Sequence, residues 1–462
     1  MKSLPTWILD WSPVKRLACF LIAASVPLAL WSAFARPFGH DEFEAIHTAW
    51  KMWSGERIYV DFFQHHHFLY YSVLGWLITL FGETTDMALA ARGLSVLMAA
   101  GIVYLTYRIA RLQFPEATAL LAVALLLTAF IFLDKAIEVR PDVPQTLMGM
   151  LAVFAWLQYA ATKRRSFLFL MAGSLFLSFL FLQKAVFLIA LLGLFSLYLV
   201  VKRRMSVRDF TILWGVLGGL LISFGAFLFA TGVWSEYLFL NWTVNTRLMN
   251  TFFPLKYLWF SASENPILWL AFLAGSGWLF WQRKPYFIGL IALGLLGTAF
   301  FSRTPFAQYF LLAMPFVAIV AAEALVTLLH VWRTGPVLAV IGLSAFYPAY
   351  LVMDEIGETN AGQLQKIEYV RSMTKPSDLV YDGDANFNLF RKDMDYFWFS
   401  VRPKKGVLSA YQSLRPYPYD PYVLIAKREP RLISDSFLKM KDPVIVENYI
   451  RSEHYRDLWI RK

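Results

Sequence analysis

The sequence contains very little cysteine and few charged residues. Cys19 is the single cysteine among 462 residues, so no disulfide can form within the chain. Any part of the chain outside the cytoplasm must therefore be held together by packing. Charged residues make up 16% of the sequence, whereas soluble domains contain about 25%. This scarcity of charge argues against a soluble globular protein.

Hydrophobic residues are abundant and occur in long blocks. They make up 58% of the chain, and the mean hydropathy is +0.50. The blocks are about 17 to 24 residues long, close to the length of helix that crosses a hydrocarbon core of about 30 Å. Eleven such blocks lie near residues 17–35, 88–110, 117–133, 143–161, 166–182, 185–201, 211–231, 266–281, 286–301, 306–329 and 337–353. We predict an all-α polytopic membrane domain with about eleven transmembrane helices.

The basic residues indicate how this domain lies in the membrane, because Lys and Arg are enriched in cytoplasmic loops. The apolar stretch 68–81 would span only about 21 Å as a helix, and if it crossed, every later basic turn would change sides. With a cytoplasmic N-terminus, the cytoplasmic turns carry Arg108, Arg111 and the basic residues of 163–165, 202–208, 283–284 and 333. We predict a multi-pass inner-membrane protein with its C-terminus outside. This topology explains the net charge of +11 better than nucleic-acid binding does.

Residues 354–462 are polar enough to fold in water. Runs such as Tyr422–Ile425 and Val444–Val446 are typical of strands, and Pro, Asp and Gly punctuate the segment. We therefore predict a small extracytoplasmic α/β domain. The chain then divides into a transmembrane domain, residues 1–353, and a C-terminal domain, residues 354–462.

The first outer loop, residues 36–86, is long and holds the first candidate catalytic residue, Asp41. A helix over 42–53 would place four apolar side chains on one face that could lie on the bilayer surface: Phe43, Ile46, Trp50 and Trp53. Asp41 then has two interpretations. It could be the N-cap of this helix, with Glu44 completing a capping-box pattern. It could instead be a general base at the membrane–water boundary.

Three consecutive histidines, His65, His66 and His67, follow in the same loop. They cannot all point one way, since neighbours lie about 100° apart on a helix and alternate on a strand. One or two could face a phosphate or bind a metal as neutral imidazole. The alternative is that they are interfacial polar residues at the start of the next helix. The spacing lacks the HxxxH or HxH pattern of a metal site.

The second and third outer turns supply the other candidates. Residues 134–144 carry five charges in a short turn, and Asp142 could cap the following helix or act as a second carboxylate beside Asp41. The third turn contains the lone cation Lys184, which could instead snorkel to the headgroups. Arg303 is similarly placed before the tenth span. Carboxylates together with cations suit a phosphorylated lipid substrate, because cations bind phosphate and a carboxylate activates a hydroxyl.

At these residues the chain resembles the GT-C superfamily of membrane glycosyltransferases. The resemblance is closer to the branch that contains protein O-mannosyltransferases and the lipid A aminoarabinose transferase. It follows the chain in order from residue 36 to about 330. The matching motifs are His40-Asp41-Glu42, residues 53–56 and 61–66, Ala91-Arg92-Gly93-Leu94-Ser95, Arg140-Pro141-Asp142, Phe181-Leu182-Gln183-Lys184, and residues 308–310 and 314–315.

The resemblance implies an inverting transfer in which a sugar leaves a polyprenyl phosphate while Asp41 activates the acceptor hydroxyl. Asp142 is the second carboxylate that it implies. The residues expected to bind substrate are Glu42, Tyr59, His65, His66, Arg140, Lys184 and Arg303, of which Lys184, Arg303 and His65 would offset the charge of the leaving phosphate. Two motifs depart from the family. The chain has Gln183-Lys184-Ala185 where family members often have Thr-Lys-Gly, and Gln64-His65-His66-His67 where the lipid A enzyme has Glu-Lys-Pro-Pro. The second change removes a carboxylate that could ligate a metal, so we expect transfer without a cofactor, with a divalent metal as the alternative.

Two other classes of function compete with this one. A transporter or flippase of lipid-linked sugars would place its ionisable groups in mid-membrane, where Glu323 is the clear example. A structural subunit of an envelope complex would not require charged residues in three successive outer turns. The expected partners are a polyprenyl-phosphate sugar, membrane lipids and an acceptor that is lipid A or core, a glycan or a protein, with no nucleic acid.

Overall fold

The computed structural model describes residues 12–248, 253, 255–281, 287–301, 305–331, 334–354, 357–402, 404 and 406–462. The chain forms two compact units. The first, which we call the helical unit, comprises Met1–Arg36, Leu94–Leu221 and Thr251–Gly357. The second, the loop unit, comprises Pro37–Gly93, Ile222–Asn250 and Glu358–Lys462. The C-terminal residues thus cluster with the first loop, while the predicted division at 353/354 stays a prediction.

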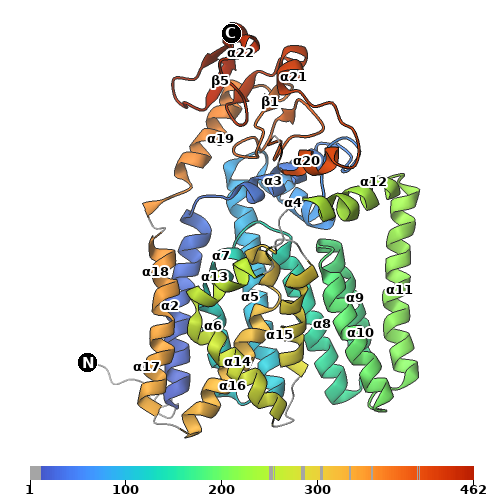
Figure 1. Cartoon of the computed structure of the whole chain (residues 1–462), viewed down its shortest axis with the longest axis vertical. Helices are drawn as coiled ribbons and strands as arrows, with labels where there is room; N and C mark the ends of the chain where they lie inside the picture. The colour runs from blue at the N-terminus through green and yellow to red at the C-terminus, as the bar shows by residue number, and fades with distance from the viewer. Residues whose placement is uncertain are drawn as a thin grey trace. The chain divides into compact units, whose positions relative to one another are not determined.

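The helical unit consists of apolar helices that run alongside one another (Figure 1). Its helices are α2 (Pro13–Ala35), most of α5 (Thr85–Gln113), α6 (Glu116–Leu127), α7 (Phe130–Lys135), α8 (Asp142–Thr162), α9 (Ser166–Phe181), α10 (Ala185–Val201), part of α11 (Val207–Ala230), α13 (Lys256–Glu264), α14 (Pro266–Trp281), α15 (Phe287–Gly297), α16 (Met314–Val331), α17 (Thr334–Ser344) and α18 (Phe346–Asp354). Each predicted apolar block lies mainly in these helices. The prediction of a mostly helical apolar fold is therefore confirmed.

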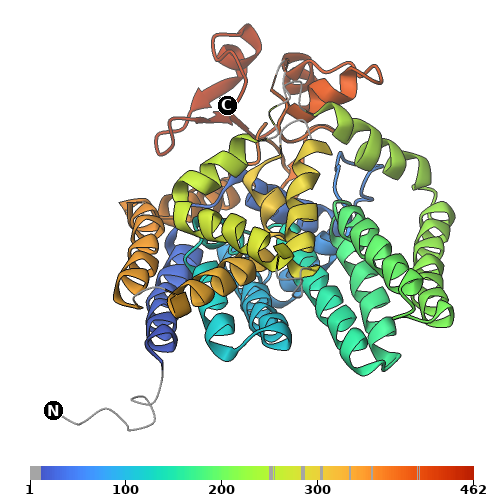
Figure 2. The ribbon, with the colours of Figure 1, turned by 60° about the horizontal axis from the view of Figure 1, so that its bottom comes forward.

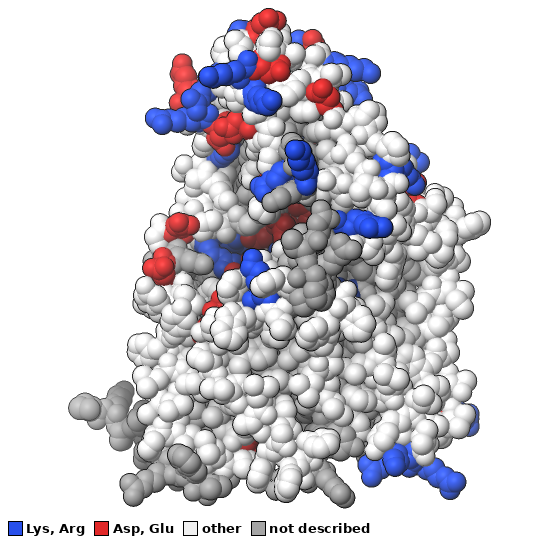
Figure 3. Space-filling view, viewed as in Figure 1, with Lys and Arg blue, Asp and Glu red and all other residues white. Residues whose placement is uncertain are grey.

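The described apolar helices differ in length, which decides whether each could cross a bilayer. Four helical segments of the described chain are long and apolar enough to span a bilayer: Pro13–Ala35, Thr85–Gln113, Val207–Ala230 and Gly335–Asp354. Seven further apolar helices are shorter, at 10–17 residues. In Figure 3 the visible face over the helical unit is almost free of charged side chains, and Lys and Arg gather where α10 leads into α11. The count of about eleven crossings stays a prediction.

Close packing and satisfied backbone groups hold the helical unit together. A Cβ at Gly275 would lie 2.7 Å from the carbonyl oxygen of Val320, so α14 and α16 approach closely through this glycine. The helix is interrupted between α6 and α7. There the side chain of Asn265 accepts a hydrogen bond from the amide of Phe130 at 3.0 Å and donates one to the carbonyl of Thr128 at 3.1 Å. A broken helix among apolar helices is stable when its backbone groups are paired in this way.

The loop unit combines helices with a small sheet (Figure 2). Its helices are α3 (His40–Trp53), α4 (Leu69–Phe81), α12 (Trp234–Leu238), the short helices Phe239–Thr243 and Val244–Arg247, α19 (Ala361–Met373), α20 (Gly406–Gln412), α21 (Pro421–Arg428) and α22 (Pro443–Asn448). The strands β1 (Leu379–Tyr381), β2 (Lys392–Asp393), β3 (Leu432–Ser434), β4 (Tyr449–Arg451) and β5 (Leu458–Arg461) are ordered β2-β1-β3-β5-β4. Strand β1 pairs in parallel with β2 and β3, and β5 pairs antiparallel with both β3 and β4. A small α/β sheet region at the C-terminus is present, as predicted.

The two runs that were predicted as strands are helical instead. Residues 422–425 lie in α21 and residues 444–446 lie in α22. Each helix begins with an Asp N-cap followed by Pro, and the carboxylates of Asp420 and Asp442 accept from backbone amides of the first turn. A cap with Pro at the first position favours helix strongly, and it outweighs the β preference of the Val and Ile residues.

The apolar face of α3 is buried inside the loop unit, so the prediction that it lies on the bilayer surface is wrong. Phe43 is 1% exposed, Ile46 is 0% and Trp50 is 4%, whereas Trp53 alone is exposed. Helix α4 packs along α3. Its thirteen residues match the short apolar stretch that was not expected to cross the membrane.

Candidate functional site

Asp41 lies in the first turn of α3 and is exposed. The N-cap of this helix is Gly39, and the carboxylate of Glu42 accepts from the Gly39 amide at 2.9 Å. The interpretation of Asp41 as N-cap, with Glu44 as its capping-box partner, is therefore wrong, because the helix begins two residues earlier. A carboxylate in the first turn is stabilised by the helix dipole without being used as a cap.

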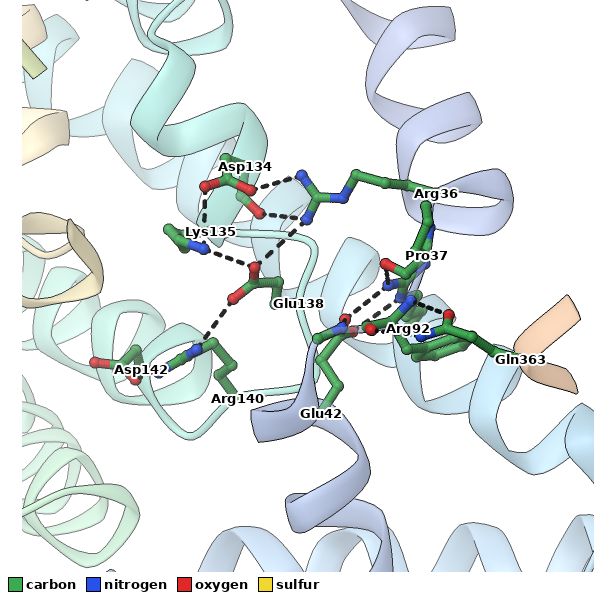
Figure 4. Close-up of polar contacts among 12 residues, drawn as sticks. Arg36, Pro37, Glu42, Arg92, Asp134, Lys135, Glu138, Arg140, Asp142 and Gln363 are labelled. Carbon is green, nitrogen blue, oxygen red and sulfur yellow. Dashed lines mark hydrogen bonds and ion pairs between the residues drawn. The ribbon is translucent and has the colours of Figure 1, made fainter. Parts of the chain in front are cut away.

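A buried ion pair fixes the chain at the start of α3 (Figure 4). Arg92 donates to both oxygens of Glu42, at 2.8 and 2.6 Å, and both side chains are 1% exposed. Arg92 also donates to the carbonyl of Pro37 at 2.8 Å. The carboxylate of Glu42, a predicted substrate-binding group, is thus used inside the protein. Arg92 was not among the candidates, although it belongs to a motif that carries the family resemblance.

The histidine segment is held against α3 by Gln64. Its amide nitrogen donates to Glu44 and, at 3.0 Å, to Thr48, while its oxygen accepts from the backbone amides of His65 at 2.7 Å and His66 at 3.1 Å. Gln64 is fully buried. It therefore couples the placement of the two predicted histidines to one face of the helix that carries Asp41.

The three histidines have different surroundings. Burial lowers the pKa of His65 to about 4, against the opposing pull of Asp41, so its imidazole is neutral at physiological pH. His67 Nε2 lies 2.9 Å from the hydroxyl of Tyr237, and His66 accepts at its carbonyl from the hydroxyl of Tyr59 at 2.8 Å. Tyr59 is 1% exposed, which favours a structural role for this predicted substrate-binding residue.

A second carboxylate near Asp41 comes from the C-terminal segment. Burial raises the pKa of Asp384. The charges of His40 and Arg402 lower this pKa, whereas the charge of Asp41 raises it further. Asp384 is half-buried and lies three residues after the end of β1. Sequence analysis missed this residue because more than 300 positions separate it from Asp41, and no local pattern joins the two segments.

Asp142 lies in the helical unit and begins α8. Its Oδ1 accepts from Lys184 Nζ at 2.6 Å, and Arg140 Nε is 3.7 Å from Oδ2. Lys184 Nζ also lies 3.6 Å from the ring centroid of Tyr309. Burial lowers the pKa of Lys184, and the ion pair with Asp142 opposes this. The structure thus brings together three predicted site residues, Asp142, Arg140 and Lys184.

A chain of alternating charges extends from Arg140 (Figure 4). Arg140 donates to Glu138 at 3.2 Å, and Lys135 donates to the other oxygen of Glu138 at 2.7 Å. Arg36, directly after α2, donates to Asp134 at 2.6 Å and lies 3.5 Å from Glu138. The second outer turn is therefore tied to the end of α2, which limits the movement of Arg140.

The candidates thus form two groups, one in each unit. Asp41 and His65 belong to the loop unit, and Asp142 to the helical unit. Arg303, the remaining candidate cation, lies outside the described residues. Within the described part of the chain, no group of three or more His, Cys, Asp or Glu residues is arranged to hold a metal ion. Transfer without a metal stays a prediction.

Residues 72–234 match the family model of dolichyl-phosphate-mannose-protein mannosyltransferases. No protein of curated function matches the chain in sequence. Among solved structures, ArnT from Cupriavidus metallidurans bound to undecaprenyl phosphate is 13% identical, with a TM-score of 0.66 over 96% of this chain and 97% of that one. Its apo state is 15% identical with the same TM-score, over 97% and 98%. The oligosaccharyltransferase AglB from Archaeoglobus fulgidus, in complex with an inhibitory peptide and a dolichol-phosphate, is 11% identical, with a TM-score of 0.59 over 90% and 69%.

These comparisons confirm the resemblance that the sequence motifs indicated. The likeness to ArnT extends over nearly the whole of both chains and includes the C-terminal region. The chain therefore has the fold of ArnT, and residues 72–234 resemble the protein mannosyltransferase family.

Proposed function

We propose that this chain, which has the fold of the GT-C membrane glycosyltransferases, transfers a sugar from a polyprenyl-phosphate donor to a hydroxyl of an envelope acceptor. The reaction takes place at the outer face of the inner membrane and inverts the anomeric carbon. The acceptor is lipid A or its core, a glycan or a protein. The observation that carries the proposal is the exposed carboxylate of Asp41, in the first turn of α3, within electrostatic reach of the buried imidazole of His65.

The residues of this chain account for each bond change. Asp41 takes the proton of the acceptor hydroxyl, and the hydroxyl oxygen attacks the anomeric carbon from the face opposite the phosphate. The bond between that carbon and the phosphate oxygen breaks, and the polyprenyl phosphate leaves with the electron pair. The proton on Asp41 is then released to water.

The leaving phosphate gains negative charge, which requires cations. Lys184 and Arg140 are held beside Asp142, and Arg303 is the third cation of the proposal. Because Asp142 already binds Lys184 at 2.6 Å, its role is to hold the ammonium rather than to act as the base. A Lys held in this way presents its remaining N–H donors to a phosphate.

The function is tested by identifying the sugar and then transferring it with purified protein. Lipids and glycans from cells with and without the gene are compared by mass spectrometry to find the missing sugar. The purified protein is then supplied with that sugar on polyprenyl phosphate and with extracts from the deletion strain. Sugar transfer with release of polyprenyl phosphate is expected. Movement of the intact lipid-linked sugar across vesicles without release would support a flippase instead.

Glu323 argues against the transporter alternative. It is the clear mid-span acid of the sequence, yet it is 8% exposed and accepts from the hydroxyl of Thr118 on α6 at 3.0 Å. Its carboxylate therefore takes part in packing between α16 and α6. A coupled transporter places such a group in a water-filled pathway instead.

The proposed orientation is tested with single cysteines at positions 57, 400 and 203, after Cys19 is replaced by Ser. Positions 57 and 400 should react with a membrane-impermeant thiol reagent in intact spheroplasts, and position 203 only after lysis. Arg203 belongs to the basic turn between α10 and α11 and is exposed. Reaction at position 203 in sealed cells would reverse the proposed topology.

A further inference from the structure

Helix α3 is bound to the C-terminal segment through one of its faces, formed by His47, Trp50 and Lys51. These residues are spaced i, i+3 and i+4, so they project from the same side of the helix. Asp393, in β2, is the main partner on the other side. Its Oδ2 lies 2.8 Å from His47 Nε2 and 2.8 Å from Lys51 Nζ.

This contact is deeply buried and fully paired. The side chain of His47 is 0% exposed, that of Lys51 is 3% and that of Asp393 is 5%. Asn388 donates to the second oxygen of Asp393 at 3.0 Å. His47 Nδ1 lies 3.0 Å from the carbonyl oxygen of Leu389, which fixes the ring from its other side. A buried charge with this many partners holds its surroundings in one arrangement.

A second connection joins the same helix face to the same segment. Trp50 donates from its indole nitrogen to Glu83 at 2.8 Å, and the other oxygen of Glu83 is 3.6 Å from Arg391. The neighbouring α3 face, with Glu44 and Thr48, holds Gln64 and so the histidine segment. The C-terminal segment therefore supports the helix that carries the proposed base and positions its neighbours.

We propose that Asp393 is a positioning residue of the transfer reaction, which holds α3 so that Asp41 and His65 keep their reactive placement. This inference rests on the proposed function and assigns the C-terminal domain a role in the chemical step itself. A displacement of about 1 Å at a reacting group can reduce a rate by about 100-fold. Asp393 is buried against α3, so it is not available to contact the donor or the acceptor, and we expect its loss to affect kcat more than donor KM.

The test uses the double variant Lys51→Met with Asp393→Asn in the full-length protein. It removes the charges of Lys51 and Asp393 together and leaves only Glu56, the other partner of Lys51 at 3.0 Å, whose side chain is 22% exposed. Folding is therefore preserved better than in Asp393→Asn alone, which would leave the buried ammonium of Lys51 without Asp393. Asp457→Asn is the matched control, because this residue also pairs with a lysine of the C-terminal domain, Lys366, but its side chain is half exposed. Donor KM, kcat and amide hydrogen exchange are measured for each protein.

The double variant should lose about 10- to 100-fold in kcat with little change in donor KM. Amide exchange should increase over residues 40–46 and stay unchanged in the β3–β5 strands. Asp457→Asn should match the wild type in all three measurements. The proposal is overturned if exchange at 40–46 is unchanged, if kcat stays at the wild-type value, or if the only effect is a lower melting temperature with normal kcat per folded molecule.

The exchange measurement also separates this proposal from the assignment of the base. If Asp41→Asn remained active while the double variant loosened residues 40–46 and lost kcat, the base would be wrong and the positioning role of Asp393 would stand. A milder variant, Asn388→Ala, removes one hydrogen bond to Asp393 and should show the same pattern with a smaller loss. A wild-type exchange pattern with reduced kcat in this variant would contradict the role of the network.

Discussion

Asp41 and Asp142 are both carboxylates in the first turn of a helix that follows a loop, yet their environments differ. Asp41 is exposed and has a neutral imidazole and a second carboxylate, Asp384, within electrostatic reach. Asp142 is 4% exposed and is bonded to an ammonium group at 2.6 Å. A carboxylate that accepts a proton must be accessible to the acceptor and must not lose an ion pair on protonation. This difference supports the proposal that Asp41 is the base and that Asp142 holds a cation.

The largest expected effect is that of Asp41→Asn. The substitution removes the proton acceptor, so turnover should fall by about 10²–10⁴-fold. The residue is not the N-cap, and Asn retains the shape of Asp, so the melting temperature should hardly change. Sugar transfer and thermal unfolding are measured on the same purified protein.

Asp61→Asn serves as a matched control for Asp41→Asn, since Asp61 is an exposed acid of the same loop that pairs with Arg57. It should retain wild-type turnover. If Asp41→Asn were nearly as active as the wild type, the comparison would be reversed and Asp142 would become the candidate base.

The next effect concerns stability rather than turnover. Glu42→Gln leaves the guanidinium of Arg92 buried without its counter-ion, and breaking such a pair costs about 3–5 kcal/mol. Denaturant unfolding in detergent should show this loss. Glu429→Gln, in an exposed pair with Arg461, is the control and should cost at most about 1 kcal/mol. An unchanged stability in Glu42→Gln would show that the pair is not what holds the start of α3.

Lys184→Ala tests the other side of the comparison. A charge-assisted contact to the donor phosphate is worth about 1.5–3 kcal/mol, so donor KM should rise by about 10- to 100-fold. Lys15→Ala removes a cation from an exposed pair with Glu116 and should leave donor KM unchanged. A wild-type donor KM in Lys184→Ala would leave the ion pair with Asp142 as the explanation of this residue.

Much of the helical unit is predictable from the sequence, because an apolar block of membrane length has few alternatives to a helix. The candidates Asp41, Asp142 and Lys184 could also be found, since charged residues are conspicuous between apolar blocks. The family resemblance then gave them roles, which the described contacts of Asp142 and Lys184 refine.

The contacts between distant segments could not be predicted. Asp393 is 342 positions from Lys51, and Arg92 is 50 positions from Glu42. A single sequence contains no signal that pairs one buried charge with another. The face of α3 was misplaced for the same reason: an amphipathic helix fits a bilayer surface or a protein partner equally well, and the partner here is formed by remote segments.

The effect that most directly compares the electrostatics of the two sites is the pH dependence due to His65. Its folded pKa is about 4, below the ordinary value of 6.5, because it is buried. Between pH 6.5 and 4 the unfolded chain binds a proton that the folded protein excludes. The free energy of unfolding should therefore fall as the pH falls through this window, by at most about 1.4 kcal/mol per pH unit, with no further loss from this group below pH 4.

His65→Gln should flatten this decline, because the amide does not titrate. His454→Gln is the control, since His454 is exposed in the C-terminal domain and its replacement should leave the slope unchanged. Denaturant unfolding at pH 7, 6 and 5 measures the three proteins. If His65→Gln lost stability as steeply as the wild type, His65 would not be the buried neutral group beside Asp41. The environment of Asp41 would then be closer to the charged environment of Asp142 than the structure indicates.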